Sequence, residues 1–296
     1  MKTVFFSSSP FTLPILEELL VNPKFELIGV VTQPDWEQRG KMYSNPIASY
    51  CNKNKIRLFQ PFKLNKEVEN FKLFFQDFDL GVVASYGQII NSEILNFPKK
   101  GMINWHPSLL PLYRGPTPLQ FSIANGDKSG GLTWIKMDKG MDSGDIIKSY
   151  NLEYNNENFN ELINKFGKLG AKTVEEVVTQ YETAILTPQD HELATFTKLL
   201  TKTSGFVEYP QKTSSNDLFA IYNAYYTFPK LVIPTTRFGE VKILDMEIFD
   251  SNDLKIEEED SDFYYYKGKM YLKCLDGVLK INEIQLSNGR KVKSTK

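Results

Sequence analysis

Short apolar runs alternate with amphipathic segments through the first 186 residues. The apolar runs are rich in β-branched and aromatic residues and are bounded by turn residues, which is typical of buried strands. The alternation of such runs with helical segments favours an α/β fold with a mostly parallel sheet and right-handed crossovers. The predicted strands are Val4–Phe6, Leu27–Val31, Leu80–Ala84, Met102–Trp105, Gly131–Met137 and Ile146–Leu152. The predicted helices are Phe11–Leu20, Ile47–Asn54, Val68–Phe75, Thr117–Ala124 and Asn158–Leu186.

The pattern changes after Leu186. The stretch 187–205 is polar, and we expect it to be a linker. Beyond it come short strand-like pieces separated by turn signals, a pattern that suggests a small β-barrel over 206–296. The predicted strands there are Val241–Asp245, Phe263–Tyr266, Met270–Cys274 and Val278–Ile281.

Composition and charge exclude several classes of protein. With 296 residues, 41% of them hydrophobic, the chain can build one large or two smaller cores. Its net charge of −1 argues against a general nucleic-acid coat, although a local basic patch stays open. Cys51 and Cys274 match no metal spacing, and we expect both to be reduced. Neither a signal peptide nor a membrane-spanning stretch is evident, so we predict a cytoplasmic protein.

Asn104, His106 and Asp142 carry the strongest chemical signal. His106 is one of only two histidines and follows Asn104 by two residues at the end of an apolar run. Residues i and i+2 of a strand share a face, so these two side chains are expected to point the same way. An amide donor beside an imidazole can stabilise an oxyanion and move a proton. Asp142 could fix the tautomer and the orientation of that imidazole.

Two other carboxylates compete with Asp142. Asp138 and Asp145 lie in the same short segment, together with two glycines. Three carboxylates so close together could also form a surface turn or a cation site. The pattern of residues alone leaves these alternatives open.

Two fragments carry a resemblance to a known family. They are N-W-H-P-S-L-L-P-L-Y-R-G (104–115) and M-D-K-G-M-D-S-G-D (137–145). They resemble the signature of formyltransferases that use 10-formyltetrahydrofolate, N-x-H-x-S-L-L-P followed by D-x-G-x-D. Weaker matches in the same order extend the resemblance over nearly the whole chain and are most similar to the methionyl-tRNA formyltransferase family. They are F-F-S-S-S-P-F-T-L-P-I-L (5–16), V-V-T-Q-P-D (30–35), F-Q-P (59–61), A-S-Y-G-Q-I-I (84–90) and I-N-E-I-Q-L-S-N-G-R-K-V (281–292).

The resemblance implies a fold and a mechanism. It implies a Rossmann-like formyltransferase domain over 1–186, a linker over 187–205 and an OB-like, tRNA-binding barrel over 206–296. An amine attacks the formyl carbon, and Asn104 and protonated His106 donate hydrogen bonds to the oxyanion of the tetrahedral intermediate. The family pattern places the catalytic carboxylate at Asp142. Its charge favours the imidazolium, and through water it could take the proton that the amine loses.

The resemblance also implies the two substrates and the residues that contact them. The acceptor is methionyl-initiator tRNA, and the loop with Arg39 and Lys41 contacts its acceptor stem. Trp36 and Tyr43 flank these basic residues and could stack on unpaired end bases. We expect no metal and a monomeric protein. The residues expected near 10-formyltetrahydrofolate are Ser85, Tyr86, Gly87, Gln88, Ile89, Ser108, Leu109, Leu110, Pro111, Asp138 and Gly140.

Three departures from the family pattern keep other acceptors open. The loop after Asp35 is shorter and less basic, and Y-Y-T-F-P (225–229) replaces F-N-P-W-P. Residues 206–296 hold 13 Lys and Arg against 14 Asp and Glu, so this part is not basic overall. The alternative enzyme is a formyltransferase for an amino sugar attached to a nucleotide. The alternative without enzymatic activity is a folate- or RNA-binding module. The segment Ser85–Ile90 could likewise be a simple strand-to-helix turn.

Overall fold

The computed structural model describes residues 1–38, 40–249, 258–259 and 263–294. The contacts between residues divide the chain into two compact units. The first unit holds residues 1–118, 130–152 and 163–197, and the second holds 119–129, 153–162 and 198–296. None of the helices in the described ranges has the length and the apolar character needed to cross a bilayer.

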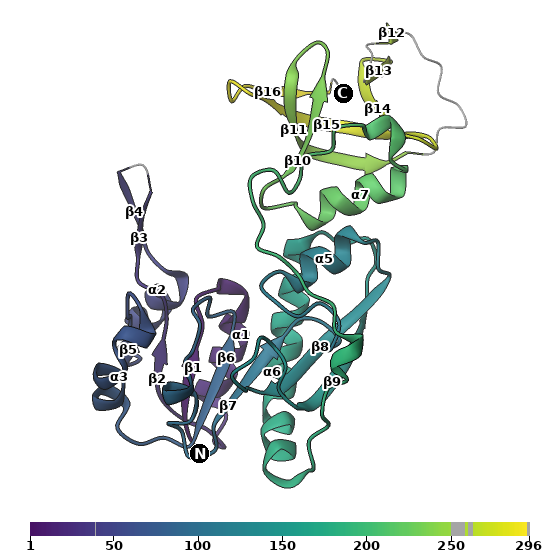
Figure 1. The fold of residues 1–296 in the computed structure, drawn as a ribbon. Helices are drawn as coiled ribbons and strands as arrows, with labels where there is room; N and C mark the ends of the chain where they lie inside the picture. The colour runs from purple at the N-terminus through teal and green to yellow at the C-terminus, as the bar shows by residue number, and fades with distance from the viewer. Residues whose placement is uncertain (39, 250–257, 260–262, 295–296) are drawn as a thin grey trace. The chain divides into compact units, whose positions relative to one another are not determined.

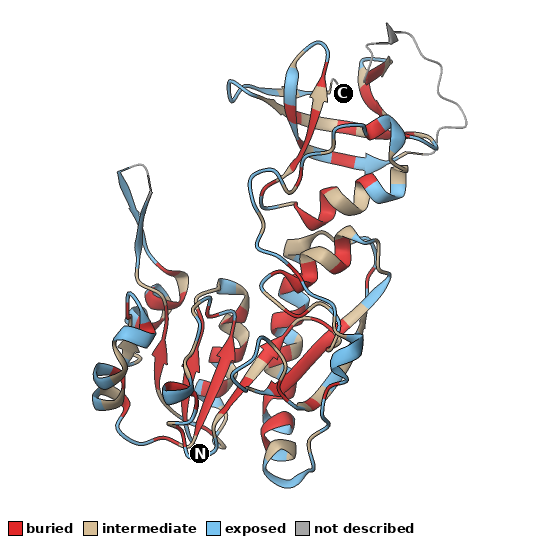
Figure 2. Ribbon diagram, viewed as in Figure 1, coloured by how far each residue is buried: buried red, intermediate tan, exposed pale blue. Residues whose placement is uncertain are grey.

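A seven-stranded sheet forms the centre of the first unit (Figure 1). Its strand order is β5-β2-β1-β6-β7-β8-β9, with parallel pairs from β5 to β7 and an antiparallel pair between β7 and β8. The mostly parallel α/β sheet is therefore confirmed. Its central strands are buried almost throughout (Figure 2), which explains why they form continuous apolar runs in the sequence. The strands are β1 (Lys2–Phe6), β2 (Glu26–Val31), β5 (Leu58–Phe59), β6 (Leu80–Ala84), β7 (Met102–His106), β8 (Ser129–Lys136) and β9 (Ile146–Glu153).

Residues of β7 alternate between the two faces of this sheet. Met102 packs into an apolar cluster with Phe71 of α3, on one face. On the other face Trp105 donates from Nε1 to the carbonyl oxygen of Phe166 in α6, at 3.3 Å. The helices of the first 183 residues are α1 (Leu13–Val21), α2 (Pro46–Lys53), α3 (Val68–Phe75), α4 (Ser92–Leu95), α5 (Pro118–Ala124) and α6 (Phe159–Thr183), with short 3-10 helices at Pro10–Thr12 and Leu64–Lys66.

The segment after Asp35, predicted to be a loop, forms a two-stranded hairpin. Strands β3 (Trp36–Gln38) and β4 (Lys41–Tyr43) pair in antiparallel fashion. Trp36 and Tyr43 lie opposite each other, with ring centroids 5.7 Å apart and planes 13° apart. A cross-strand aromatic pair stabilises such a hairpin. Three residues a strand are too few to give a visible sequence period.

The second unit is built on an antiparallel sheet. Its strand order is β10-β11-β15-β14-β13-β12, with β16 beside β15. A buried apolar cluster joins the sheet to Leu218 and Tyr222 of α7 (Ser215–Ala224). The register of β11 shifts around Asp245, which interrupts the regular alternation of its side chains. The strands are β10 (Leu231–Thr235), β11 (Gly239–Ile248), β12 (Glu258–Glu259), β13 (Phe263–Tyr266), β14 (Lys269–Lys273), β15 (Val278–Leu286) and β16 (Lys291–Lys293).

The four strands predicted for this part correspond to β11, β13, β14 and β15. The sequence analysis missed α7, β10, β12 and β16. It also missed two 3-10 helices, His191–Leu193 and Pro210–Lys212. An antiparallel, β-rich sheet is present in this part of the chain, and α7 is an addition to the expected strands.

Both cysteines are buried and free, as the sequence analysis expected. Burial raises the pKa of the Cys51 thiol to about 11. Burial, together with the charge of Asp276, raises the pKa of the Cys274 thiol to about 12. Both thiols are therefore protonated and unreactive at neutral pH.

Candidate active site

Asn104, His106 and Asp142 meet at the carboxyl end of β7. Asn104 donates from Nδ2 to Oδ1 of Asp142 at 3.3 Å, and Nδ1 of His106 lies 3.6 Å from the same oxygen. The backbone N–H of Gly115 donates to the other carboxylate oxygen of Asp142 at 2.8 Å. The structure thus brings together the three residues that the sequence analysis selected for catalysis. Asn104 and His106 share one face of β7, opposite Trp105.

The His106 ring lies between two acceptors. Its Nε2 lies 3.0 Å from the carbonyl oxygen of Tyr113. Because a carbonyl can only accept, Nε2 carries a proton in this arrangement. Nδ1 faces the carboxylate of Asp142, 3.6 Å away, which is the position for an ion pair with an imidazolium. The arrangement fits the role expected for Asp142.

The competing carboxylates have different surroundings. Asp138 is exposed, and its Oδ1 accepts from the backbone N–H of Gly140 at 2.9 Å and from Oγ of Ser143 at 2.8 Å. It therefore stabilises the turn. Asp145 is exposed too, and its carbonyl oxygen pairs with the N–H of Lys136. Asp142 is the carboxylate whose contacts reach Asn104 and His106.

Strand β8 holds the S-L-L-P segment, residues 108–111, through hydrogen bonds. Thr133 is fully buried and donates from Oγ1 to the carbonyl oxygen of Ser108 at 2.7 Å. The same hydroxyl accepts from the N–H of Leu110 at 3.1 Å. Oγ of Ser108 donates to the carbonyl of Leu112, and the side chain of Leu109 lies against Gly131. Of the residues expected near folate, Ser108 and Leu110 are buried, and Leu109 and Pro111 are partly exposed.

The segment 85–89 turns sharply after β6. Ser85 and Gly87 have positive φ values of 50° and 81°, and both are exposed. Tyr86 is buried in an apolar cluster, and Gln88 accepts from the N–H of Leu64 through its Oε1. Ile89 is 82% exposed. Three of the five residues therefore face solvent, whereas Tyr86 and Gln88 pack into the protein. The folate contacts of this segment stay a prediction.

The hairpin exposes the residues that were expected to contact tRNA. Arg39 lies outside the described residues. Lys41 is exposed, with Nζ 5.5 Å from the centroid of the Tyr43 ring. Trp36 and Tyr43 are also exposed. Because these two rings stack on each other, one face of each ring is already covered. Their contact with tRNA stays a prediction.

The stretch 187–205, which we expected to be a linker, contributes contacts to the active-site loop. The N–H of Arg114 donates to the carbonyl of Thr195, and the N–H of Thr197 donates to the carbonyl of Arg114, both at 2.8 Å. Gln189 bonds to the side chain of Arg114 and to the backbone of Asp142. Sequence analysis quoted Arg114 within its motif but gave it no role. A polar composition alone gave no signal for Gln189.

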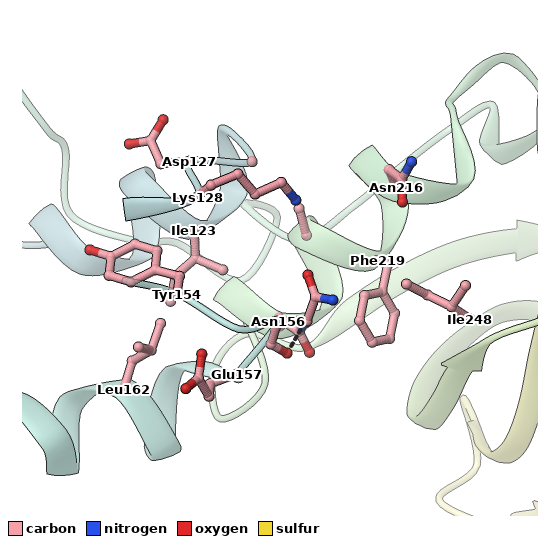
Figure 3. A pocket seen from close by; sticks show the side chains of 13 residues that line it. Ile123, Asp127, Lys128, Tyr154, Asn156, Glu157, Leu162, Asn216, Phe219 and Ile248 are labelled. Carbon is pink, nitrogen blue, oxygen red and sulfur yellow. Dashed lines mark hydrogen bonds between the residues drawn. The ribbon is translucent and has the colours of Figure 1, made fainter. Parts of the chain in front are cut away.

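The second unit contains a small pocket (Figure 3). Its lining includes Asp127, Lys128, Asn156 and Phe219. It contains none of the residues predicted to act in catalysis or binding. Within the described parts of the chain, no group of three or more His, Cys, Asp or Glu side chains is arranged to hold a metal ion.

Known proteins resemble this chain in sequence and in fold. A model of the formyl transferase family matches residues 1–178. Methionyl-tRNA formyltransferases from Caldicellulosiruptor saccharolyticus and Acetivibrio thermocellus are each 32% identical, over 99% of this chain and 94% of theirs. The crystal structure of an N-formyltransferase from Helicobacter canadensis, solved with folinic acid and dTDP-3-aminofucose, superposes with a TM-score of 0.67. It covers 99% of this chain and 100% of that one at 17% identity, so it shows a shared fold alone. The chain therefore belongs to the formyl transferase family, and nearly its whole length is similar to methionyl-tRNA formyltransferases.

Proposed function

We propose that this protein transfers a formyl group from 10-formyltetrahydrofolate to the amino group of methionyl-initiator tRNA. The observation that carries the proposal is the Asn104–His106–Asp142 cluster, in a chain whose whole length is similar to enzymes of that name. An intact set of catalytic groups also argues against a module that only binds folate or RNA.

In the proposed reaction the amine nitrogen attacks the formyl carbon, and the carbonyl electron pair moves onto oxygen. Asn104 has a second amide N–H besides the one bonded to Asp142, and this N–H can donate to the oxyanion. His106 in its protonated form places a positive charge beside the site, while its Nε2 faces the carbonyl oxygen of Tyr113 and its Nδ1 faces Asp142. The carboxylate takes the proton of the attacking amine through water. The bond from carbon to N10 then breaks, and N10 takes a proton as the oxyanion collapses.

The proposed folate site uses the exposed parts of two turns. Ser85 and Gly87 expose backbone polar groups after β6, and Asp138 and Gly140 are exposed in the loop that presents Asp142. A structure of HypX from Aquifex aeolicus, solved with tetrahydrofolic acid, has a related fold, with a TM-score of 0.65 at 14% identity. That likeness supports a common fold, and the turns of this chain supply the polar groups.

The proposed domain assignment follows the sequence pattern and the family resemblance. Residues 1–186 form the catalytic domain, 187–205 connect the domains, and 206–296 form an OB-like barrel that binds tRNA. The antiparallel strand order and the register shift at Asp245 support a curved, barrel-like sheet. The hairpin with Lys41 is the proposed contact to the acceptor arm. The monomeric state and the cytoplasmic location stay predictions.

The acceptor can be tested directly. Purified protein is incubated with 10-formyltetrahydrofolate carrying a labelled formyl group, and with either methionyl-initiator tRNA or a nucleotide-linked amino sugar. We expect label on the tRNA and none on the sugar. Label on the sugar alone would replace the proposal with the alternative enzyme. Label on neither acceptor would favour the binding module. The sugar alternative has weaker support, because the solved sugar enzyme is only 17% identical.

A further inference from the structure

Gln189 lies between the two segments that carry the proposed catalytic residues. Its Nε2 donates to the carbonyl oxygens of Asp142 at 2.8 Å and Gly144 at 2.7 Å. Its Oε1 accepts from Nε and Nη2 of Arg114, at 3.1 and 2.6 Å. Both Gln189 and Arg114 are buried. One side chain therefore joins the loop after β7 to the loop that presents Asp142.

These four contacts determine the orientation of the Gln189 amide. An amide has two N–H donors and an oxygen with two lone pairs, and all of them are used here. The guanidinium of Arg114 can only donate, and the two backbone carbonyls can only accept. A flipped amide would set donors against donors and acceptors against acceptors. A buried group matched in this way resists displacement, because any shift leaves a polar atom unpaired.

The backbone at Asp142 needs such support. Its φ of 49° lies in the left-handed region, which is unfavourable for a residue with a side chain. Gly144 is packed so closely on β8 that a Cβ there would lie 1.7 Å from the carbonyl oxygen of Lys136. The Gln189 amide bonds the carbonyls on both sides of Ser143. The N–H of Gly115 holds the Asp142 carboxylate from another segment.

Arg114, on the other side of the Gln189 amide, is also held in place. Nη2 of Arg114 lies 3.0 Å from Nδ1 of His191, which accepts because the guanidinium donates. The backbone of Arg114 pairs with Phe196 in a parallel bridge. Arg114 is therefore held by the same stretch of chain that carries Gln189. A change at Gln189 is transmitted to Asp142 rather than absorbed by movement of the arginine.

We propose that Gln189 is a positioning residue for Asp142. Together with Arg114 it holds the two segments in a register in which the Asp142 carboxylate faces both Asn104 and His106. It acts through Asp142 and needs no contact with either substrate. This inference rests on the proposed function, because it is defined by the reaction that Asp142 serves.

Two substitutions test the proposal. Gln189→Leu removes all four hydrogen bonds at similar size. Gln189→Glu keeps the acceptor for Arg114 but turns an oxygen, in place of the N–H donor, toward the two carbonyls. This variant replaces the leucine variant in the test if the leucine variant fails to fold. For either variant we expect kcat of formyl transfer to methionyl-tRNA to fall about 100-fold, because small displacements of a catalytic group cost that much. KM for both substrates should change less than about threefold, on the scale of side-chain effects away from the binding surface.

The deciding measurement repeats Gln189→Leu in an Asp142→Ala background, by single-turnover transfer of labelled formyl. If Gln189 acts through Asp142, the second substitution lowers the rate less than about threefold there, because coupled residues are not additive. If Gln189→Leu lowers the rate by the same factor with and without Asp142→Ala, the role of Gln189 is merely structural and the inference is overturned. If Asp142→Ala lowers the rate but neither Gln189 variant does, the inference alone fails. If Asp142→Ala has no effect, the catalytic assignment fails with it.

Gln180→Leu is the matched control. Gln180 lies in α6 and donates from Nε2 to the carbonyl oxygen of Ile147 at 2.9 Å, also in the first unit. The substitution removes an amide donor to a backbone carbonyl without touching either catalytic segment. We expect its kcat to equal that of the wild type within about twofold. A loss as large as that of Gln189→Leu would mean that any such contact in this unit affects the rate, and would overturn the proposal.

Discussion

Two segments follow strands of the same sheet but are built differently. The catalytic loop, residues 107–115 after β7, is bonded to Thr133, Thr195, Thr197 and Asp142. The hairpin after β2, described over residues 36–38 and 40–43, is held by the pairing of its own two strands and by the stacked Trp36 and Tyr43. At its base, Asp35 accepts from the N–H of Asn45. One segment is fixed by the rest of the unit, and the other projects exposed side chains.

The difference suits the two tasks proposed for these segments. Donors to an oxyanion are effective when they are already fixed where the charge develops, because no reorganisation is then needed during the reaction. A surface that contacts a large, charged partner can instead be exposed and adaptable. We therefore expect changes in the catalytic loop to act on kcat, and changes in the hairpin to act on KM for the tRNA.

The largest effect is expected from His106→Ala and Asp142→Ala. Each removes a charged group that acts on the reacting atoms in the proposed mechanism, Asp142 through a water, so kcat should fall about 100-fold to 1,000-fold. The fold should persist at a lower free energy of unfolding, since His106 is buried and each substitution leaves a polar partner, such as the N–H of Gly115, without its bond. Steady-state rates and thermal melts of the purified variants are the measurement. A variant with nearly the wild-type rate would remove that residue from the mechanism.

Thr133→Val tests whether hydrogen bonds from β8 hold the catalytic loop in place. It removes a buried hydroxyl that makes hydrogen bonds to Ser108 and Leu110. Leaving those backbone groups unpaired should lower the free energy of unfolding by about 2 kcal/mol. Trp36→Ala in the exposed hairpin should lower it by less than about 1 kcal/mol. Denaturant unfolding of the two variants gives both values. Equal values would contradict the comparison of the two segments.

The hairpin should act on binding of the acceptor. If Trp36 stacks on an unpaired end base, Trp36→Ala should weaken the binding free energy of methionyl-tRNA by roughly 1–3 kcal/mol. This loss raises KM about 5-fold to 150-fold. Lys41→Ala should reduce the salt dependence of that KM. A protein that makes fewer phosphate contacts releases fewer counterions when it binds. Lys53→Ala, at an exposed lysine at the end of α2, is the control. Salt profiles for Lys41→Ala and Lys53→Ala that coincide with the wild type would separate the hairpin from tRNA binding.

The smallest effects are expected from substitutions that compare Asp138 and Asp145 with Asp142. Asp138→Asn and Asp145→Asn should each lower kcat less than about tenfold, and less than Asp142→Asn does. Asn at 138 can still accept from the N–H of Gly140, and Asp145 is exposed. Rates of the three variants under one set of conditions decide the order. If Asp145→Asn is the most damaging, the catalytic assignment is displaced by three residues.

The sequence predicted the first unit better than the second for a physical reason. A parallel strand buried on both faces, such as β6, is a continuous apolar run that stands out in the sequence. In the second unit the missed strands β12 and β16 have only two and three residues, too few to show a period, and β10 contains Pro234, which is unfavourable inside a strand. Most of the first unit was therefore predictable from its apolar runs, whereas the choice of Asp142 as the partner of Asn104 and His106 depended on the family resemblance. The roles of Arg114 and Gln189 were not predictable, because they depend on a contact across 75 residues.

The comparison of the two segments is tested most directly by one side-by-side experiment. Single-turnover formyl transfer is measured for the wild type, His106→Ala and Trp36→Ala over a range of methionyl-tRNA concentrations. We predict that His106→Ala lowers the maximal rate at least about 100-fold with little change in the half-saturating concentration. Trp36→Ala should raise that concentration and leave the maximal rate within about twofold. The reverse pattern, or no transfer to tRNA by the wild type, would contradict the account.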